Sequence, residues 1–155
     1  NIEDNILVCS EPINSYEAAV LATFFRERLV EGENTFSFET VMSHQSKLDF
    51  LLQAKHSGFK IYFYYVCTQD PQINLLRVKN RVKKGGHDVD ENKILNRYYR
   101  SLDLLFNAFN IADRAFLLDN SSQKRSLILE KKSNQIFFKE QNIPAWIFKY
   151  LIDKY

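Results

Sequence analysis

The sequence predicts an α/β fold with a mostly parallel sheet, built as a single domain over residues 1–155. Apolar residues at helical spacing alternate along the chain with short runs typical of strands, the pattern of helices packed on a sheet. Residues 60–67 (KIYFYYVC) are almost continuously apolar and aromatic, as expected for a strand buried on both faces of a parallel sheet. With 45% hydrophobic residues, the chain can bury a substantial core.

The first expected helix covers residues 14–32. Asn14 can cap its start together with Glu17, and Gly32 offers a left-handed stop. Its apolar stripe consists of Tyr16, Val20, Leu21, Phe24, Phe25 and Leu29.

Residues 35–40 (TFSFET) alternate phenylalanines with smaller polar residues and predict a short strand. Residues 46–56 return to helical spacing, and Gly58 ends that helix before the apolar strand begins.

A helical hairpin is expected after the apolar strand. Asp70 caps its first helix, Pro71 suits the first turn, and the helix runs to the pair Gly85-Gly86. Asp90 caps the second helix, which is expected over residues 91–110.

The last third of the chain predicts a short strand at residues 115–118 and a small hairpin formed by residues 127–129 and 136–138. Pro144 then opens a terminal amphipathic helix with Trp146, Phe148 and Leu151 on its apolar side.

The segment over residues 77–102, called the basic hairpin below, concentrates positive charge. Eight basic residues against three acidic ones give it a net charge of +5, in a chain of +2. Cations around a flexible glycine turn suit a polyanion, above all a phosphate chain. The alternative is a solvated hairpin with ordinary surface lysines. The basic residues are Arg77, Lys79, Arg81, Lys83, Lys84, Lys93, Arg97 and Arg100.

Acidic and hydroxyl side chains supply further candidates. Glu39 and Thr40 follow the expected strand at residues 35–40, where they could orient a substrate hydroxyl or hold hydrated Mg²⁺. Alternatively, Thr40 caps a strand-to-helix turn. Glu3 and Asp4 form an acidic pair that, by itself, marks a helix start or a surface.

Residues 119–121 either contact a nucleotide base through Asn120 or make a turn, which is the simpler interpretation. His87 orders the glycine loop or touches a phosphate. No metal site is expected, because Cys9 and Cys67 lie far apart without nearby ligands. They are expected to be reduced thiols of a cytoplasmic protein, since the sequence shows no signal peptide or hydrophobic span.

The stretches FSFET, RVKNRVKKGGHDV and RYYRSL together resemble the zeta-toxin-like family of bacterial P-loop kinases. In that family, a sequence similar to RVxxRVxxGGHxVxxxxIxxRYxRSL forms the lid that closes over the nucleotide, here about residues 77–100. The likeness runs from about residue 1 to residue 121.

The resemblance implies a P-loop kinase-like three-layer fold and transfer of the γ-phosphate of ATP or GTP, with Mg²⁺, to a hydroxyl of a small molecule. Such an acceptor could be a nucleotide sugar such as UDP-N-acetylglucosamine, and the partners could include an antitoxin protein. Glu3, or Asp4 beside it, stands in the place of the family's catalytic base. Glu39 and Thr40 would contact the substrate.

The family's lid arginines correspond to Arg81 and Arg97, which would stabilise charge on the transferred phosphoryl group. The implied nucleotide contacts are Arg77, Gly85, Gly86, His87, Arg100 and Asn120.

The chain departs from the family in having no GxxxxGK[ST] stretch. The phosphate loop, the first strand, the first helix and the second strand are therefore expected upstream of Asn1. The chain alone should bind nucleotide weakly and be inactive.

A different class of function is a degenerate member of the family that binds a nucleotide or a protein without catalysis. A membrane partner is not expected. Nucleic acid is not expected either, because the aromatic residues of the basic hairpin do not interleave with its cations as a stacking platform requires.

Overall fold

The computed structural model describes residues 2–3, 6–7 and 14–155. The chain divides into two compact units, Asn1–Glu39 and Thr40–Tyr155. That the chain forms a single domain stays a prediction.

The first unit contains two short antiparallel strands, β1 (Ile2–Glu3) and β2 (Ile6–Leu7), followed by helix α1 (Ser15–Glu31). The predicted capping box at the start of α1 is confirmed: the Asn14 side chain accepts from the backbone N–H of Glu17 at 3.0 Å, and the Glu17 carboxylate accepts from the backbone N–H of Asn14 at 2.8 Å.

The predicted left-handed stop at Gly32 is wrong. Gly32 has a φ of −84°, and the left-handed residue is Glu33, with a φ of 55°. Gly32 is needed for its size, since a Cβ there would lie 2.7 Å from the Asn34 side-chain nitrogen.

The predicted strand at residues 35–40 is also wrong, because residues 34–43 contain no strand. The rings of Phe36 and Phe38 do stack, with centroids 6.2 Å apart, as residues on one side of an extended chain can. A strand also needs a hydrogen-bonding neighbour, and none of the strands in the described residues pairs with this segment. The alternation of phenylalanines with polar residues indicated an extended chain, but it carries no information about whether a second strand lies beside it.

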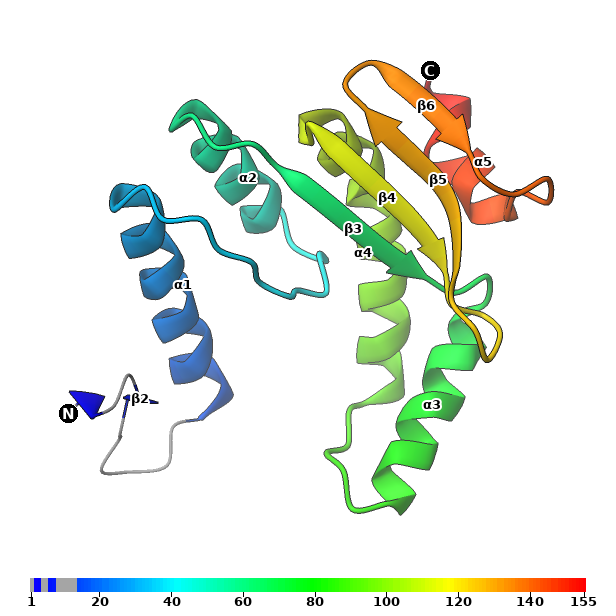
Figure 1. Ribbon diagram of the computed structural model, residues 1–155. Coiled ribbons are helices and arrows are strands. Elements are labelled where there is room, and N and C mark those ends of the chain that lie inside the picture. The colour runs from blue at the N-terminus through cyan, green and yellow to red at the C-terminus, as the bar shows by residue number, and fades with distance from the viewer. Residues whose placement is uncertain (1, 4–5, 8–13) are drawn as a thin grey trace. The chain divides into compact units, whose positions relative to one another are not determined.

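The second unit is built on a four-stranded sheet in the order β3-β4-β5-β6 (Figure 1). The strands are β3 (Tyr62–Cys67), β4 (Arg114–Asp119), β5 (Ser126–Lys132) and β6 (Gln135–Phe138). The α/β class and the predicted C-terminal hairpin are confirmed. The mostly parallel sheet is wrong: only β3 and β4 pair in parallel, and the other two pairings are antiparallel. The links from β4 to β5 and from β5 to β6 are too short for the crossover that parallel pairing requires.

Four α-helices and a short 3-10 helix belong to this unit: α2 (Ser46–His56), α3 (Pro71–Lys83), α4 (Glu91–Ile111), α5 (Ala145–Tyr150) and η1 (Ile152–Lys154). Helix α4 is central, since it contacts α2, α3 and α5, and it runs behind the sheet in Figure 1. The predicted helix starts at Asp70 and Asp90 are confirmed, because each carboxylate accepts a backbone N–H of the first turn. Gly58, with a φ of 87°, follows the end of α2 as expected.

Strand β3 is buried on one face, not on both as predicted. Tyr65 and Cys67 point into the core, whereas Tyr62, Tyr64 and Val66 are exposed. Helix α4, which contacts α2, α3 and α5, runs behind the sheet in Figure 1, on the side of the buried residue Tyr65, whose hydroxyl lies 3.1 Å from Ser101 Oγ of α4. A run of apolar residues cannot by itself distinguish one buried face from two.

The terminal helix also differs in detail from the expectation. Trp146, Ile147 and Leu151 are buried, while Phe148 is 45% exposed. None of the helices described in residues 15–154 combines the length and apolar character that crossing a bilayer requires.

Candidate functional site

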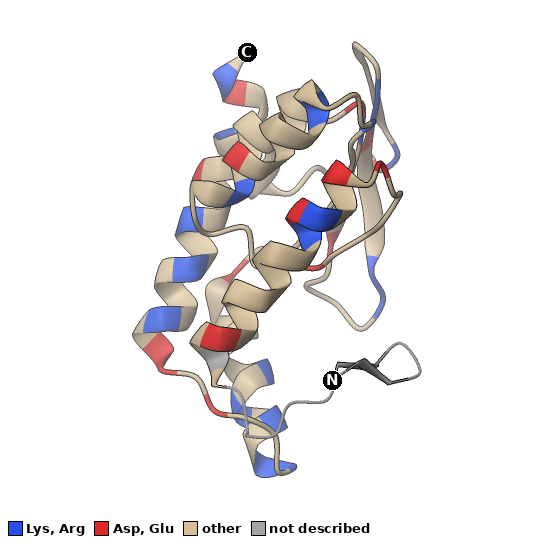
Figure 2. Cartoon of the chain, turned by 90° about the vertical axis from the view of Figure 1, so that its left-hand side faces the viewer, with Lys and Arg blue, Asp and Glu red and all other residues tan. Residues whose placement is uncertain are grey.

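The basic hairpin carries an open hollow of about 370 Å³ at the C-terminal half of α3. Three of its lining side chains, Arg77, Arg81 and Lys84, are spaced i, i+4 and i+7, so they share one flank of the helix. Asn80 and Gly86 complete the lining. Figure 2 shows basic residues along both helices of the hairpin and near its turn. The hollow therefore gathers three cations within reach of a single anion.

The glycine turn shapes this hollow. Gly85 has a φ of 83°, a left-handed conformation that favours glycine. At Gly86 the requirement is space, because a Cβ would lie 2.6 Å from Arg81 Cγ and 3.0 Å from the Arg81 carbonyl oxygen. Arg81 also donates from Nη2 to the carbonyl of His87 at 3.0 Å. The turn thus holds Arg81 across the glycine pair.

Arg77 links the hollow to the sheet. Its Nη2 donates to the carbonyl of Ser122, just after β4, at 3.3 Å. This bond, like the bond of Arg81, occupies one of the five N–H donors of a guanidinium, so both arginines keep donors for an oxyanion.

Helix α4 presents a second basic ridge, formed by Lys93, Arg97 and Arg100 at the same i, i+4, i+7 spacing. Two residues next to these cations, Tyr98 and Ser101, anchor the helix. Tyr98 donates its hydroxyl to the carbonyl of Thr68 at 2.8 Å, and Ser101 Oγ lies 3.1 Å from the hydroxyl of Tyr65. The anchors fix the rotation of α4 about its axis and keep its cations off the buried face.

The groups around these anchors have strongly shifted pKa values. Burial raises the pKa of the Cys67 thiol to about 11, and burial likewise raises the pKa of Tyr65 and Tyr98. All three groups therefore stay protonated at neutral pH. They hold the sheet and α4 together and supply no base or nucleophile.

Residues 119–121 form a turn, as the simpler interpretation predicted. Asp119 Oδ1 accepts from the backbone N–H of Ser121 at 2.9 Å, and the backbone N–H of Asn120 donates to the Cys67 carbonyl at 2.7 Å. Ser121 Oγ accepts from the backbone N–H of Gln69 at 2.8 Å, which ties the ends of β3 and β4 together. A nucleotide contact by Asn120 stays a prediction.

The acceptor-side candidates fall elsewhere in the chain. Glu3 lies in β1, and Glu39 is the last residue of the first unit. Thr40 is the first residue of the second unit, the unit that also contains the basic hairpin. Asp4 lies outside the described residues. Thr40 Oγ1 accepts from the backbone N–H of Met42 at 3.4 Å, a local contact. Cooperation of these residues with the basic hairpin stays a prediction.

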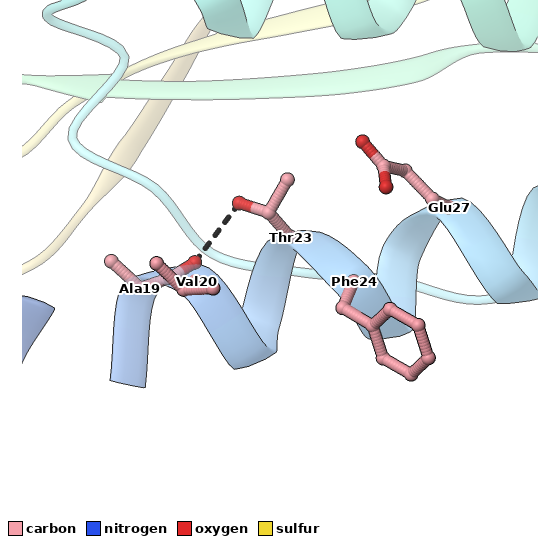
Figure 3. A pocket seen from close by; sticks show the side chains of 5 residues that line it. All are labelled: Ala19, Val20, Thr23, Phe24 and Glu27. Carbon is pink, nitrogen blue, oxygen red and sulfur yellow. Dashed lines mark hydrogen bonds between the residues drawn. The ribbon is translucent and has the colours of Figure 1, made fainter. Parts of the chain in front are cut away.

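A second hollow, of about 430 Å³, follows a single face of α1. Ala19, Val20, Thr23, Phe24 and Glu27 line it (Figure 3). The hydroxyl of Thr23 is already bonded to the Ala19 carbonyl at 2.9 Å, and no cation lines the hollow. This hollow therefore offers fewer groups that could bind a charged ligand than the smaller hollow on α3, which is lined by three cations. Nowhere in the described residues do three His, Cys, Asp or Glu side chains gather as metal ligands would.

The sequence named Lys84 and Lys93 among the cations of the basic hairpin without giving either a site role, and it did not single out Asn80 or Ser122. Helical spacing could have identified the two lysines, because residues four or seven apart share a flank of a helix. Lys84 lies seven residues after Arg77, and Lys93 lies four residues before Arg97. Ser122 carried no such signal, since its contact with Arg77 spans 45 residues.

Comparisons with known proteins leave the family open. No family model matches the chain, and no solved structure matches it. A protein of Haemophilus influenzae, described only as uncharacterized, is 36% identical over 63 residues. The match covers 41% of this chain and 45% of that protein, so the chain spans less than half the length of this relative.

Proposed function

We propose that this chain is the lid-bearing part of a zeta-toxin-like kinase, which transfers the γ-phosphate of ATP or GTP to a hydroxyl of a small molecule. The observation that carries the proposal is the hollow in which Arg77, Arg81 and Lys84 surround a glycine that cannot be replaced without displacing Arg81. Such a hollow fits a chain of phosphates better than a neutral ligand.

The chemistry of phosphoryl transfer explains why such a surface would be useful. The reaction needs positioning and charge neutralisation more than covalent help from the protein. Arginine suits this role because its planar fork binds two phosphate oxygens at once. Arg81 and Arg97 would stabilise the transferred group, while Arg77, Arg100 and the glycine turn would hold the nucleotide phosphates.

The rest of the proposed machinery lies outside the basic hairpin. Glu3 or Asp4 would act as base toward the acceptor, and Glu39 with Thr40 would orient it. A nucleotide sugar is the proposed class of acceptor. Mg²⁺ would bridge the phosphates and neutralise part of their charge.

Binding of inorganic tripolyphosphate and of Mg-ATP tests the site directly, by isothermal titration at low salt. The double variant Arg77→Gln/Arg81→Gln should weaken tripolyphosphate binding by about a hundredfold or more, since each of the two lost charge-assisted contacts contributes about 1.5–3 kcal/mol. Lys154→Gln is the matched control: the residue is exposed in η1, beside a tyrosine that bonds Asn110 near the far end of α4. Equal affinities in all three proteins would overturn the phosphate site.

Catalysis is tested in the protein made from the complete reading frame, with γ-labelled ATP and a nucleotide-sugar acceptor. Arg81→Gln and Arg97→Gln should each lower kcat by about three orders of magnitude if they act on the transferred phosphoryl group. Tight ATP binding without transfer to any acceptor would instead identify a non-catalytic nucleotide-binding protein.

A further inference from the structure

One face of the sheet in the second unit, called the open face below, combines exposed aromatic rings with cations. Its positions on β3 and β4 are Tyr62, Tyr64, Val66, Arg114, Phe116 and Leu118, which alternate with the buried residues of each strand. Tyr62 is 55% exposed and Tyr64 is 65% exposed. Large aromatic rings at such exposure on neighbouring positions form a surface that ordinarily has a ligand or partner.

The rings and cations of the open face interleave. Tyr64 stacks on Phe116 with centroids 4.6 Å apart and planes 13° apart. The Arg114 guanidinium lies 5.0 Å from the Phe116 centroid and 6.0 Å from that of Tyr62. Lys139, the residue after β6, has its ammonium 5.6 Å from the ring centroid of Phe137 on β6, and Phe137 is 41% exposed. This interleaving joins residues of different strands, so it has no counterpart in the linear sequence.

The charge of the open face suits an anionic partner. Arg114, Lys132 and Lys139 supply three cations, and Glu130 is the acid among them. Glu130 is paired with both Arg114, at 2.5 Å, and Lys139, at 3.3 Å. The acid therefore positions two cations beside the rings, and the face keeps an excess of positive charge.

We propose that the open face binds single-stranded nucleic acid, with unpaired bases stacked on Tyr62 and Tyr64 and the phosphates drawn to Arg114, Lys132 and Lys139. Tyr62 and Tyr64 are two residues apart on an extended strand, which separates them by about 7 Å and leaves room for a base on each ring. Stacking on exposed aromatic rings between cations is how single-strand binding sheets hold bases without reading their sequence. A duplex would hide its bases from such a surface.

Fluorescence anisotropy of the full chain with labelled oligothymidylate and oligouridylate of about twelve nucleotides tests this proposal. Tyr62→Ala and Tyr64→Ala should each weaken binding by about tenfold, whereas Tyr64→Phe, which keeps the ring, should bind within about twofold of the parent chain. Tyr16→Ala is the matched control, because Tyr16 is 76% exposed on α1 and belongs to the first unit. Equal affinity for both oligonucleotides would mean that the surface does not recognise the 2′-hydroxyl. A preference for one of them would identify RNA or DNA as the ligand.

Two further measurements separate stacking from simple attraction to the basic hairpin. Affinity should fall with salt with a log–log slope of about −2, the value for roughly three phosphate contacts. The double variant Arg81→Gln/Arg97→Gln should retain tight binding. Binding that survives Tyr62→Ala and Tyr64→Ala but is lost in this double variant would overturn the proposal. Equal affinity for a duplex, or no binding together with self-association through the sheet, would also overturn it.

This inference does not rest on the proposed kinase function, and it differs from it in one respect: a three-layer kinase fold would cover the open face with helices. The two use different surfaces of the second unit, and their tests change different residues. Failure of oligonucleotide binding leaves the tripolyphosphate result intact, and the reverse also holds.

Discussion

The hydroxyl of Tyr98 on α4 donates a 2.8 Å hydrogen bond to the backbone carbonyl of Thr68, at the point where β3 ends. The bond joins residues 30 positions apart and fastens the helix that carries Arg97 to the sheet. Thr68 is itself buried, so its carbonyl could not turn to water if the bond were lost. The position of the second basic ridge depends on this contact.

Replacing Tyr98 with phenylalanine should therefore lower the free energy of unfolding by about 1–2 kcal/mol, because a buried carbonyl loses its hydroxyl donor and keeps only the weaker thiol donor of Cys67, at 3.3 Å. Urea denaturation measures the change. The control is Tyr99→Phe: Tyr99 is 48% exposed, so its hydroxyl can bond to water, and its removal should cost less than about 0.5 kcal/mol. Equal costs at the two positions would contradict the role assigned to the Tyr98–Thr68 bond.

Lys131 caps the C-terminal end of α4. Its ammonium donates to the carbonyls of Phe109 at 2.7 Å, Ala112 at 2.9 Å and Asn110 at 3.2 Å. A cation there satisfies carbonyls that a helix end leaves unpaired. Lys131→Met should cost about 2–3 kcal/mol in denaturant unfolding, whereas the neighbouring exposed Lys132→Met should cost less than about 0.5 kcal/mol. A small effect at Lys131 would mean that water replaces the ammonium at these carbonyls.

Gly86→Ala tests the close approach of Arg81 to the glycine turn. The added Cβ would meet both the Arg81 side chain and its carbonyl oxygen, so Arg81 should be displaced and tripolyphosphate affinity should fall several-fold. Gly85→Ala is the comparison: the space there is open, but the left-handed φ of 83° should cost about 1–2 kcal/mol of stability with little loss of affinity. Titration and denaturation of both variants separate the two effects. Equal loss of affinity in both would show that the turn acts only through folding.

Burial of Cys67 predicts a loss of stability in alkali. Its pKa is about 11 in the folded chain against 9.0 for an ordinary thiol, so between these values the unfolded chain gives up a proton that the folded chain keeps. The free energy of unfolding contributed by this group is fully present below pH 9.0 and is lost as the pH rises towards about 11, by about 3 kcal/mol in total.

Urea denaturation at several pH values from about 8 to 11 measures this loss. Cys67→Ala and Cys67→Ser remove the titrating thiol, so both should show a shallower decline than the parent chain. Burial and then Cys67 raise the pKa values of Tyr65 and Tyr98, so the decline that these tyrosines add should be smaller in the two variants, in the same direction as the loss of the thiol. Parallel curves for the parent and the variants would contradict a buried, protonated thiol.

The helices and their caps were fixed by local interactions, and the sequence therefore determined them. Asn14, Asp70 and Asp90 cap helices through backbone groups two or three residues away, so spacing alone was enough. The sequence also showed directly that cations are concentrated around Gly85 and Gly86.

Only the tertiary structure decided which residues face one another across the strands. It left residues 34–43 without a neighbouring strand, turned two of the three sheet pairings antiparallel and covered a single face of β3. It also set Arg114 between Tyr62 and Phe116, although 52 residues separate Arg114 from Tyr62. Such contacts follow from strand order and register, which depend on distant pairings that no local pattern encodes.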